Sequence, residues 1–512
     1  MDKRYDSFWS EVLHLFHDYQ IQFDAITDQA GYRFENQMWM DQQHAVKQRL
    51  ELLSDLHARI DWTIYRNEFS VSELDGLKSA FHRLKFSGQI TQGIHALAAE
   101  ILRSLGEMSY SIPETRSKNI DEVVLKISGI GADLISSLFE NLSWNGKIHQ
   151  AGLLAERISN HMTNNIGTVE SILYYPDIFY RNQHAYLVAV AERKGEFIPF
   201  ILPFIHSSQG ITCDAVIIGE EAMIHVFSFS RSYFQVRCHE PENLVHFLSR
   251  WMPSKSKAQL FINLGYVDWG KHLLLDELLI SLRESNSPFH FAPGIRGLVM
   301  IVFTFPQANL VVKIIRDVPK PPKEGTKKEV ISKYNLVATL DRAGRVADAQ
   351  RYSRIDIPIQ YFSDELLQEL KEEAPNSVFI SQGKVILSDV YLERKLMPMN
   401  MYLAQYPEQA EGVITDYGRS IEEMASTNLF PGDLLIKNFG ISQEQRVIFY
   451  DYDEVCRVTE CEFLPLPTNW EDDEVRQQMV VYPHQIFPEE FPKFLLPQLY
   501  RHILTDHFSH LF

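Results

Sequence analysis

The chain has 512 residues, of which 45% are hydrophobic and 23% are charged, a composition typical of a globular protein with two or three domains. Its formal net charge of −18 argues against a general binding surface for nucleic acid or anionic lipid, because such surfaces need an excess of basic residues. Four cysteines in a chain of this length do not make a disulfide framework, and their spacing does not match a zinc site.

The N-terminus does not have the pattern of a secretory signal peptide, because no apolar stretch follows Met1–Asp6. The longest apolar run, Gly297–Phe305, has the length of a strand and not of a membrane span. We therefore expect a cytoplasmic protein with reduced thiols that binds neither nucleic acid nor membranes.

Residues 1 to about 165 have the pattern of helices. Apolar residues recur there at helical spacing near the N-terminus and again at 45–56 and 94–105. The pattern then changes, and from about 185 to 236 short apolar runs are broken by Gly, Asn or Ser, which predicts a small antiparallel sheet. The strand candidates are 185–190, 198–202, 215–218 and 224–229, and helical patterns return at 244–251 and 272–282.

A second change of pattern occurs near Ser287-Pro288. The elements predicted beyond it are strands at 298–305, 310–316, 378–380 and 385–391 and helices at 328–352 and 412–428. The sequence thus predicts an α+β protein with a mostly helical domain at 1–290, which includes the small sheet, and a second domain at 291–512.

Three polar residues in the second domain have the spacing of a kinase active site. Asp433, Asn438 and Asp451 are separated by five and thirteen positions, as are the catalytic Asp, the metal-binding Asn and the Asp of Asp-Phe-Gly in protein kinases. One carboxylate must accept the proton of a hydroxyl, while an amide oxygen and a second carboxylate hold Mg²⁺ on the phosphates. The structural alternatives are a polar turn for Asp433 and Asn438 and a solvated strand end for Asp451 and Asp453. The combined spacing favours phosphoryl transfer.

A phosphate-binding loop is predicted upstream of these residues. Gly294 and Gly297 precede a predicted hairpin whose second strand carries Lys313, and glycines allow backbone N–H groups to approach phosphate oxygens. Taken alone, this Gly-x-x-Gly pattern is more often a simple turn, and a lysine at a strand edge can face water. Lys313 is bracketed by four β-branched residues, however, and a buried ammonium needs an anionic partner. We therefore predict that the loop and Lys313 contact a nucleotide.

The same residues belong to longer segments with a specific pattern. These segments are Phe227-Ser-Phe-Ser-Arg-Ser-Tyr-Phe234, Met252-Pro-Ser-Lys255, Ala292-Pro-Gly-Ile-Arg-Gly297, Asp341-Arg-Ala-Gly-Arg-Val-Ala-Asp348, Tyr391-Leu-Glu-Arg394, Phe430-Pro-Gly-Asp433, Lys437-Asn-Phe-Gly440 and Tyr450-Asp-Tyr-Asp-Glu454. In this order the chain resembles the bifunctional isocitrate dehydrogenase kinase/phosphatase family of bacteria. The resemblance extends from the middle of the first domain to near the C-terminus.

This resemblance implies a protein-kinase-like, two-lobed domain behind an N-terminal regulatory domain. It implies ATP-dependent phosphorylation of one serine of isocitrate dehydrogenase, which inactivates that enzyme, and removal of the phosphate by the same protein. The two reactions would control flux between the citric acid cycle and the glyoxylate bypass. Both would use one nucleotide site with ATP or ADP and Mg²⁺, and AMP acting on the regulatory region would favour the phosphatase.

The resemblance also assigns roles to single residues. The residues that would line the phosphates of ATP are Ala292, Pro293, Gly294, Ile295, Arg296, Gly297 and Leu298. Lys313 would bind these phosphates, Asp433 would orient the substrate serine and take its proton, and Asn438 and Asp451 would hold Mg²⁺. Adenine would pack against Tyr391–Arg394, and Asp348 matches the position assigned to the phosphatase reaction.

Asp348 also has a structural interpretation. If 328–352 is one helix, Asp341, Arg345 and Asp348 share a face, and an ion pair between neighbouring turns would account for the aspartate. With the resemblance we favour a role in the phosphatase reaction.

Several features depart from ordinary protein kinases. Pro-Gly-Asp replaces His-Arg-Asp, Tyr452-Asp453 replaces Phe-Gly, and the part of the chain after Asp451 is short for a kinase large lobe. No helix glutamate is an evident partner for Lys313, and Glu324 and Glu329 are the candidates. Two other classes stay open: a nucleotide-binding pseudokinase without catalysis, and an interaction scaffold. Also open are a homodimer and the route of the phosphatase, which is either direct hydrolysis or transfer through bound ADP.

Overall fold

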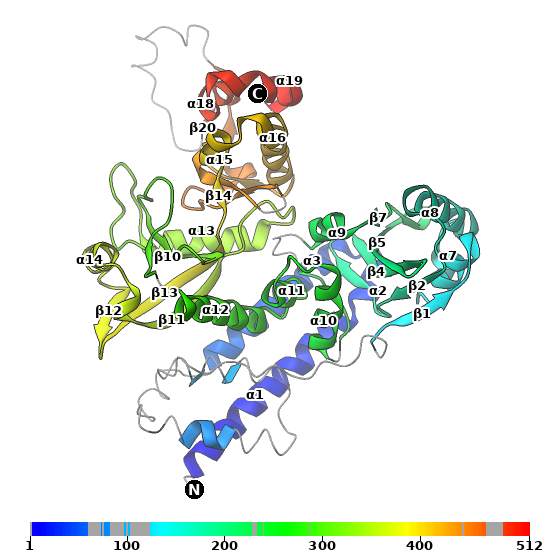
Figure 1. The fold of residues 1–512 in the computed structure, drawn as a ribbon, viewed down its shortest axis with the longest axis horizontal. Helices are drawn as coiled ribbons and strands as arrows, with labels where there is room; N and C mark the ends of the chain where they lie inside the picture. Colours follow the sequence, from blue (N-terminus) through cyan, green and yellow to red (C-terminus); the bar gives the residue numbers. More distant parts are fainter. Residues whose placement is uncertain are drawn as a thin grey trace. The chain divides into compact units, whose positions relative to one another are not determined.

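The computed structural model describes residues 3–59, 73, 76–81, 97–98, 101–102, 123–227, 233–238, 240–285, 287–442, 445–466 and 485–511. The chain forms two compact units, one of Met1–Ser228 with Ser232–Glu277 and the other of Phe229–Arg231 with Leu278–Phe512. Figure 1 shows their elements coloured along the sequence. Helices and largely antiparallel sheets occur in both units, which confirms the predicted α+β class.

The first unit begins with long amphipathic helices. Helix α1 buries Phe8, Trp9, Val12 and Phe16 along one face, as the apolar spacing predicts. The predicted helix at 45–56 lies within α3, whereas most of the one at 94–105 lies outside the described residues. The helices of this unit are α1 (Lys3–Asp28), α2 (Ala30–Glu35), α3 (Trp39–Arg59), α7 (Gly131–Glu140), α8 (Ala151–Ile166), α9 (Glu220–Val226), α10 (Pro241–Trp251), α11 (Lys257–Asn263) and α12 (Val267–Glu284), within which the chain passes to the second unit.

The sheet of the first unit has the strand order β1-β2-β4-β5-β6, with β3 beside β4 and β7 beside β5. Its strands are β1 (Leu125–Ser128), β2 (Ser171–Tyr174), β3 (Phe179–Arg181), β4 (His184–Arg193), β5 (Glu196–Ser207), β6 (Gly210–Cys213) and β7 (Ile217–Ile218). Alternate residues of β4 enter two different cores: Leu187 packs with α7 and α8, and Val188 packs with α9 and α10. Both faces of the sheet are therefore covered by helices, which explains why the sequences of these strands are continuous apolar runs.

One predicted strand in this unit is wrong. Residues 220–226 form helix α9, so the described part of the strand predicted at 224–229 starts inside a helix. Gly219 precedes the helix with φ +95°, and Glu220 and Glu221 occupy its first turn, where acidic side chains stabilise a helix. The apolar residues Met223 and Ile224 are the buried face of that helix.

The second unit starts with a six-stranded antiparallel sheet in the order β11-β13-β10-β9-β8, with β12 beside β13. Its strands are β8 (His290–Phe291), β9 (Met300–Thr304), β10 (Leu310–Ile315), β11 (Gln350–Pro358), β12 (Val378–Ser381) and β13 (Lys384–Arg394). Helix α13 (Lys327–Leu340) contributes Val330, Tyr334 and Val337 to the same core as Ile315 and Tyr391 of this sheet.

The predicted helix at 328–352 is wrong in its second half. Helix α13 ends at Leu340, because Asp341 accepts hydrogen bonds on Oδ1 from the backbone N–H groups of Ala343 (3.2 Å) and Gly344 (3.0 Å). This turn, with Gly344 at φ +69°, is the kind that an Asp before a Gly forms. A second helix, α14 (Asp364–Glu373), was not predicted.

The rest of the second unit packs around α16 (Ala410–Ser426), which confirms the helix predicted at 412–428. Short strands and helices surround it: β14 (Met397–Pro398), α15 (Met399–Gln405), β15 (Leu429–Phe430), β16 (Phe439–Ile441), β17 (Val447–Phe449), β18 (Cys456–Arg457), β19 (Glu462–Phe463), β20 (Gln485–Ile486), α18 (Phe491–Leu495) and α19 (Arg501–Phe508). Among the described helices of the two units, none is both long and apolar enough to cross a bilayer.

Candidate nucleotide and phosphoryl-transfer site

Asp433 lies in a tight loop between β15 and a short 3₁₀ turn, Ile436–Asn438. Its Oδ1 accepts a hydrogen bond from the backbone N–H of Leu435 at 2.9 Å, and its carbonyl accepts one from Nδ2 of Asn438 at 3.2 Å. Gly432 has φ +78°, and a Cβ on it would lie 2.4 Å from the carbonyl oxygen of Glu454. Only glycine fits here, so the Pro-Gly-Asp sequence lets this loop approach the chain just after Asp451.

Asp451 follows strand β17, which pairs with β16 as a hairpin. The backbone N–H of Tyr450 donates to the carbonyl of Asn438 at 3.1 Å, so the hairpin places Asp451 next to Asn438. Hydrogen bonds accepted by the backbone carbonyls of Asp433 and Asn438 therefore bring the three residues predicted from spacing together. Burial, then the neighbouring Asp453, raise the pKa of Asp451 well above its ordinary value.

The donor set fits a magnesium ion. In the described part of the chain, no group of three or more His, Cys, Asp or Glu side chains could by itself hold a metal. Mg²⁺ in kinases needs no such cage, because one or two protein ligands act together with phosphate oxygens and water. Asn438 donates its amide N–H to Asp433, which leaves the amide oxygen to serve as a ligand beside the carboxylate of Asp451.

Lys313 is buried in β10, as the apolar residues around it predict, with 6% of its surface exposed. Its Nζ lies 2.7 Å from Oε2 of Glu393 and donates to the carbonyl of Tyr450 at 2.9 Å. The partner of Lys313 is therefore on the neighbouring strand β13, and both helix candidates were wrong. Glu329 instead closes the capping box of α13 with Thr326, and Glu324 is exposed in the preceding loop.

The predicted phosphate loop, Ala292–Leu298, connects β8 to β9. The backbone N–H of Ala292 donates to Val302, and Gly294 has φ +110° with a Cβ position 3.5 Å from Pro398. Among the described residues, no acceptor takes a hydrogen bond from the backbone N–H groups of residues 294–297. Successive free N–H groups are the feature that binds anions in phosphate loops.

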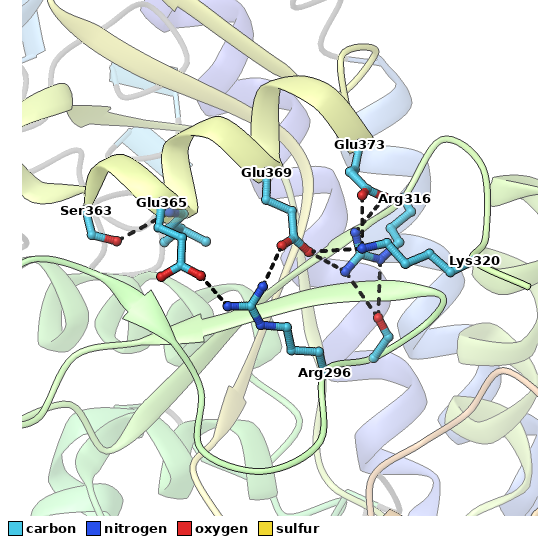
Figure 2. Close-up of polar contacts among 9 residues, drawn as sticks. Arg296, Arg316, Lys320, Ser363, Glu365, Glu369 and Glu373 are labelled. Atoms are coloured by element: carbon cyan, nitrogen blue, oxygen red, sulfur yellow. Dashed lines mark hydrogen bonds and ion pairs between the residues drawn. The ribbon is translucent and has the colours of Figure 1, made fainter.

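The side chain of Arg296 is directed toward helix α14. Figure 2 shows its guanidinium between Glu365 and Glu369 of helix α14, and the group also lies 3.7 Å from the centre of the Phe291 ring. The sequence-based assignment of residues 292–298 to the phosphates stays a prediction, with the backbone of the loop as the part that could bind them. The side chain of Arg296, in contrast, is paired with the glutamates of α14.

Asp348 lies in an irregular segment between α13 and β11, and not on a helix. Gln350 donates Nε2 to both of its carboxylate oxygens, at 2.8 Å each, while Arg345 pairs with Asp416 on α16. The alternative interpretation of Asp348 as part of a helical ion pair required one helix from 328 to 352, and α13 ends at Leu340. The backbone N–H of Ala347 donates to the carbonyl of Phe449 at 2.8 Å, so the segment that ends at Asp348 runs beside β17, the strand that leads to Asp451.

A second lysine, which the sequence did not single out, lies at the same site. Nζ of Lys323 is 3.1 Å from Oδ2 of Asp453 and also pairs with Glu454. Lys323 comes from the polar loop between β10 and α13, a Pro- and Lys-rich stretch whose composition indicated only a loop. Lys313 and Lys323, each paired with a carboxylate of its own, thus both act electrostatically on Asp451, which is also next to the carboxylate of Asp453.

The sequence also matches two family models over most of its length. Residues 287–512 match the isocitrate dehydrogenase kinase/phosphatase (AceK) kinase domain, and residues 108–286 match the regulatory domain of the same family.

Curated relatives give the same result. The isocitrate dehydrogenase kinase/phosphatase of Anaeromyxobacter sp. (strain Fw109-5) is 33% identical over 510 residues, which cover 94% of this chain and 88% of the relative. That of Acidovorax sp. (strain JS42) is 33% identical over 93% of this chain and 85% of its own. That of Burkholderia thailandensis is 39% identical over 64% of this chain and 56% of its own. The chain therefore belongs to the isocitrate dehydrogenase kinase/phosphatase family.

Proposed function

We propose that this chain is a bifunctional protein serine kinase and phosphatase whose substrate is isocitrate dehydrogenase. The names of relatives that align with almost the whole chain support the substrate and both activities. One observation supports catalysis most directly: Lys313, Asp433, Asn438 and Asp451 are all retained, and hydrogen bonds to the backbone carbonyls of Asp433 and Asn438 link the last three. A non-catalytic relative would be expected to lack at least one of these four groups.

In the kinase direction the serine oxygen attacks the γ-phosphorus of ATP, and the bond to the β,γ-bridging oxygen breaks to release ADP. Asp433 aligns the hydroxyl and takes its proton. Lys313, held between Glu393 and the Tyr450 carbonyl, contributes positive charge toward the phosphates. A magnesium ion held by Asn438 and Asp451 would neutralise charge on the transferred group.

In the phosphatase direction Asp348 orients a water molecule, whose oxygen attacks the phosphorus of phosphoserine. The bond from phosphorus to the serine oxygen breaks, and that oxygen takes up a proton to restore the hydroxyl. The hydrogen bond between Ala347 and Phe449 supports this role, because it aligns the Asp348 segment with the strand before Asp451. A second route, in which bound ADP first accepts the phosphoryl group and the resulting ATP is hydrolysed, uses the same residues and stays open.

The regulatory part of the proposal rests on the family. AMP bound to the N-terminal regulatory domain would favour the phosphatase, and the two activities together would set flux between the citric acid cycle and the glyoxylate bypass. The match of residues 108–286 to the regulatory-domain model supports this assignment. A homodimer and a cytoplasmic location also stay predictions.

A pseudokinase is the alternative. It would share nucleotide binding with the proposed enzyme but would transfer no phosphate. A thermal-shift measurement with ATP, with and without Mg²⁺, separates the enzyme and the pseudokinase from an interaction scaffold that binds no nucleotide. A ligand that binds only the folded state raises its apparent stability.

The experiment that tests the proposed function is incubation of the purified chain with bacterial isocitrate dehydrogenase, Mg²⁺ and ATP labelled on the γ-phosphate. We expect label to enter the dehydrogenase as its activity falls. The Asp433→Asn variant keeps the size of the side chain and removes the base, so it should lower the rate by about 10²-fold or more while ATP still binds. A native chain that binds ATP but incorporates no label would favour the pseudokinase.

A further inference from the structure

Helix α14 lies beside the phosphate loop, and its role is not covered by the catalytic residues described above. Ser363 caps its N-terminus by accepting a hydrogen bond from the N–H of Leu366. Its apolar residues Leu366, Leu367 and Leu370 are buried. Three glutamates, Glu365, Glu369 and Glu373, recur at intervals of four residues, so they follow one face of the helix. Figure 2 shows that this acidic face is turned toward Arg296, Arg316 and Lys320.

Glu369 is the central residue of this face, and its side chain is 10% exposed. One carboxylate oxygen, Oε1, accepts a hydrogen bond from Nη2 of Arg316 at 2.6 Å. The other, Oε2, accepts one from Nη1 of Arg296 at 3.1 Å. A single carboxylate thereby connects an arginine in the phosphate loop to an arginine directly after β10, the strand that carries Lys313.

Arg316 fixes the end of the loop. Its side chain is 1% exposed, and its Nε and Nη2 donate to the carbonyl of Gly297 at 3.3 and 3.2 Å. Nη1 pairs with Glu373 at 2.9 Å. A buried guanidinium keeps this geometry only while its anionic partners remain, so the position of Gly297 depends on Glu369 and Glu373.

The start of the loop is fixed through Arg296, whose guanidinium lies on the ring of Phe291 in β8. The two arginines therefore hold the loop on both sides of Gly294 and Ile295, where Ile295 is 73% exposed. The backbone N–H groups of residues 294–297, which have no acceptor among the described residues, belong to this held segment. A loop that is already in shape binds phosphate with less loss of conformational freedom than one that must be ordered.

We infer that Glu369 is a positioning residue for nucleotide binding: by bridging Arg296 and Arg316, it sets the shape of the phosphate loop without touching the nucleotide. This inference rests on the proposed function, since it assumes that the loop receives the phosphates of ATP and ADP. It makes α14, rather than the helix α13 that follows β10, the helix that controls the phosphate end of the site.

The test compares Glu369→Gln with the native chain in the full-length protein, at a temperature where both are folded. We expect the KM for ATP in the kinase reaction and the Kd for ADP with Mg²⁺ to rise by about tenfold, while kcat at saturating ATP changes by less than about twofold. Glu369→Asp, which keeps the charge, should recover part of the affinity. A variant that is merely less folded would lose kcat in proportion to its active fraction at unchanged KM.

Two further variants on the same helix provide graded controls. Glu365→Gln removes an exposed partner of Arg296 alone and should raise the KM by about two- to threefold. Glu372→Gln removes a carboxylate whose partner is Gln368 on the same helix and should leave the KM unchanged.

A double-mutant cycle keeps the inference testable if Glu369→Gln is unstable. Arg296→Gln removes the loop side of the bridge, and Arg296→Gln with Glu369→Gln should weaken nucleotide binding no more than the stronger single change. Additive effects, or an unchanged KM in Glu369→Gln, would overturn the role of Glu369. A native chain that shows no Mg²⁺-dependent thermal shift with ATP would instead overturn the proposed function, and the inference with it.

Discussion

At the scale of single residues, the chain keeps the residues that we propose as the catalytic groups of a kinase, but the partner of its lysine differs from the helix glutamate expected from kinases. Lys313 is paired with Glu393 from the adjacent strand, and both side chains are buried. Because the two residues share one sheet, their ion pair does not depend on the position of a helix. The pair is therefore formed whenever the sheet is formed.

The first prediction concerns this pair. Glu393→Gln leaves a buried, unpaired ammonium on Lys313, which should lower the free energy of unfolding by about 3 kcal/mol and the kinase kcat/KM by at least about tenfold. Denaturant unfolding and initial-rate kinetics measure the two effects. Full activity and stability in this variant would show that the Tyr450 carbonyl alone holds Lys313.

The second prediction separates the two activities. Asp348→Ala should lose the phosphatase and keep the kinase within a few-fold, because in the proposed mechanism Asp348 orients the water of only one reaction. Rates of dephosphorylation and phosphorylation of isocitrate dehydrogenase, measured on the same preparation, provide the check. Equal loss of both would refute the division of labour between Asp348 and Asp433.

Spacing in the sequence was enough to single out Asp433, Asn438 and Asp451 as candidates, since all three lie in one loop and one hairpin. It was not enough for Glu393 and Lys323, whose contacts depend on how separate elements pair. Glu393 lies in the segment predicted to pack against adenine. It directly follows an apolar run in the sequence, and a carboxylate in such a place signals a cationic partner nearby.

At the scale of elements, an ionic cluster fixes the segment that carries Asp348. Arg345 is 3% exposed and donates two hydrogen bonds to Asp416 on α16, at 2.7 and 2.8 Å. The N–H of Val447 donates to the same carboxylate at 2.7 Å, and the N–H of Phe449 donates to the carbonyl of Arg345 at 2.8 Å. Asp416 thereby holds the Asp348 segment and strand β17 in register.

The third prediction is a pH dependence that follows from this cluster. Burial alone would raise the pKa of Asp416, but hydrogen bonds from Arg345 outweigh it and lower that pKa below its ordinary value. The stabilisation is therefore fully present above the unfolded-state pKa of about 4 and is lost as the pH falls through the lower folded-state value. Asp416→Asn should lower the free energy of unfolding by about 3 kcal/mol at pH 7. The difference in this free energy between the variant and the native chain should shrink below about pH 4.

Denaturant unfolding at a series of pH values checks this prediction, with Glu411→Gln on the exposed side of α16 as the matched control. The prediction is contradicted if the native and Asp416→Asn chains keep the same difference in free energy of unfolding down to pH 3.

Local turn chemistry accounts for the elements that the sequence misplaced. Asp341 and Gly344 end α13 early, a signal that was present in the Asp-Arg-Ala-Gly sequence but was outweighed by the apolar periodicity around it. Helix α14 also left a trace, in Ser363 as an N-cap residue followed by leucines at helical spacing. Its contacts with the phosphate loop could not be predicted from the sequence, because they join three segments that are far apart in the chain: the loop before β9, the residue after β10, and α14 itself.

At the scale of the whole molecule, composition and the changes of hydrophobic period indicated the class and order of the parts. The family models meet between residues 286 and 287, and the compact units divide within α12, whereas the sequence predicted a boundary at 290. All the proposed catalytic residues lie in the second unit. If AMP acts on the regulatory domain as proposed, its effect would have to reach these residues from outside the site, which sequence patterns alone do not describe.

The measurement that tests the central claim most directly is a labelling experiment followed by a chase. Isocitrate dehydrogenase is first labelled by the chain with γ-labelled ATP and Mg²⁺, and excess ADP and AMP are then added. The account predicts that label enters as dehydrogenase activity falls and leaves as that activity returns. Label that enters and stays through the chase would contradict the claim that one protein performs both reactions.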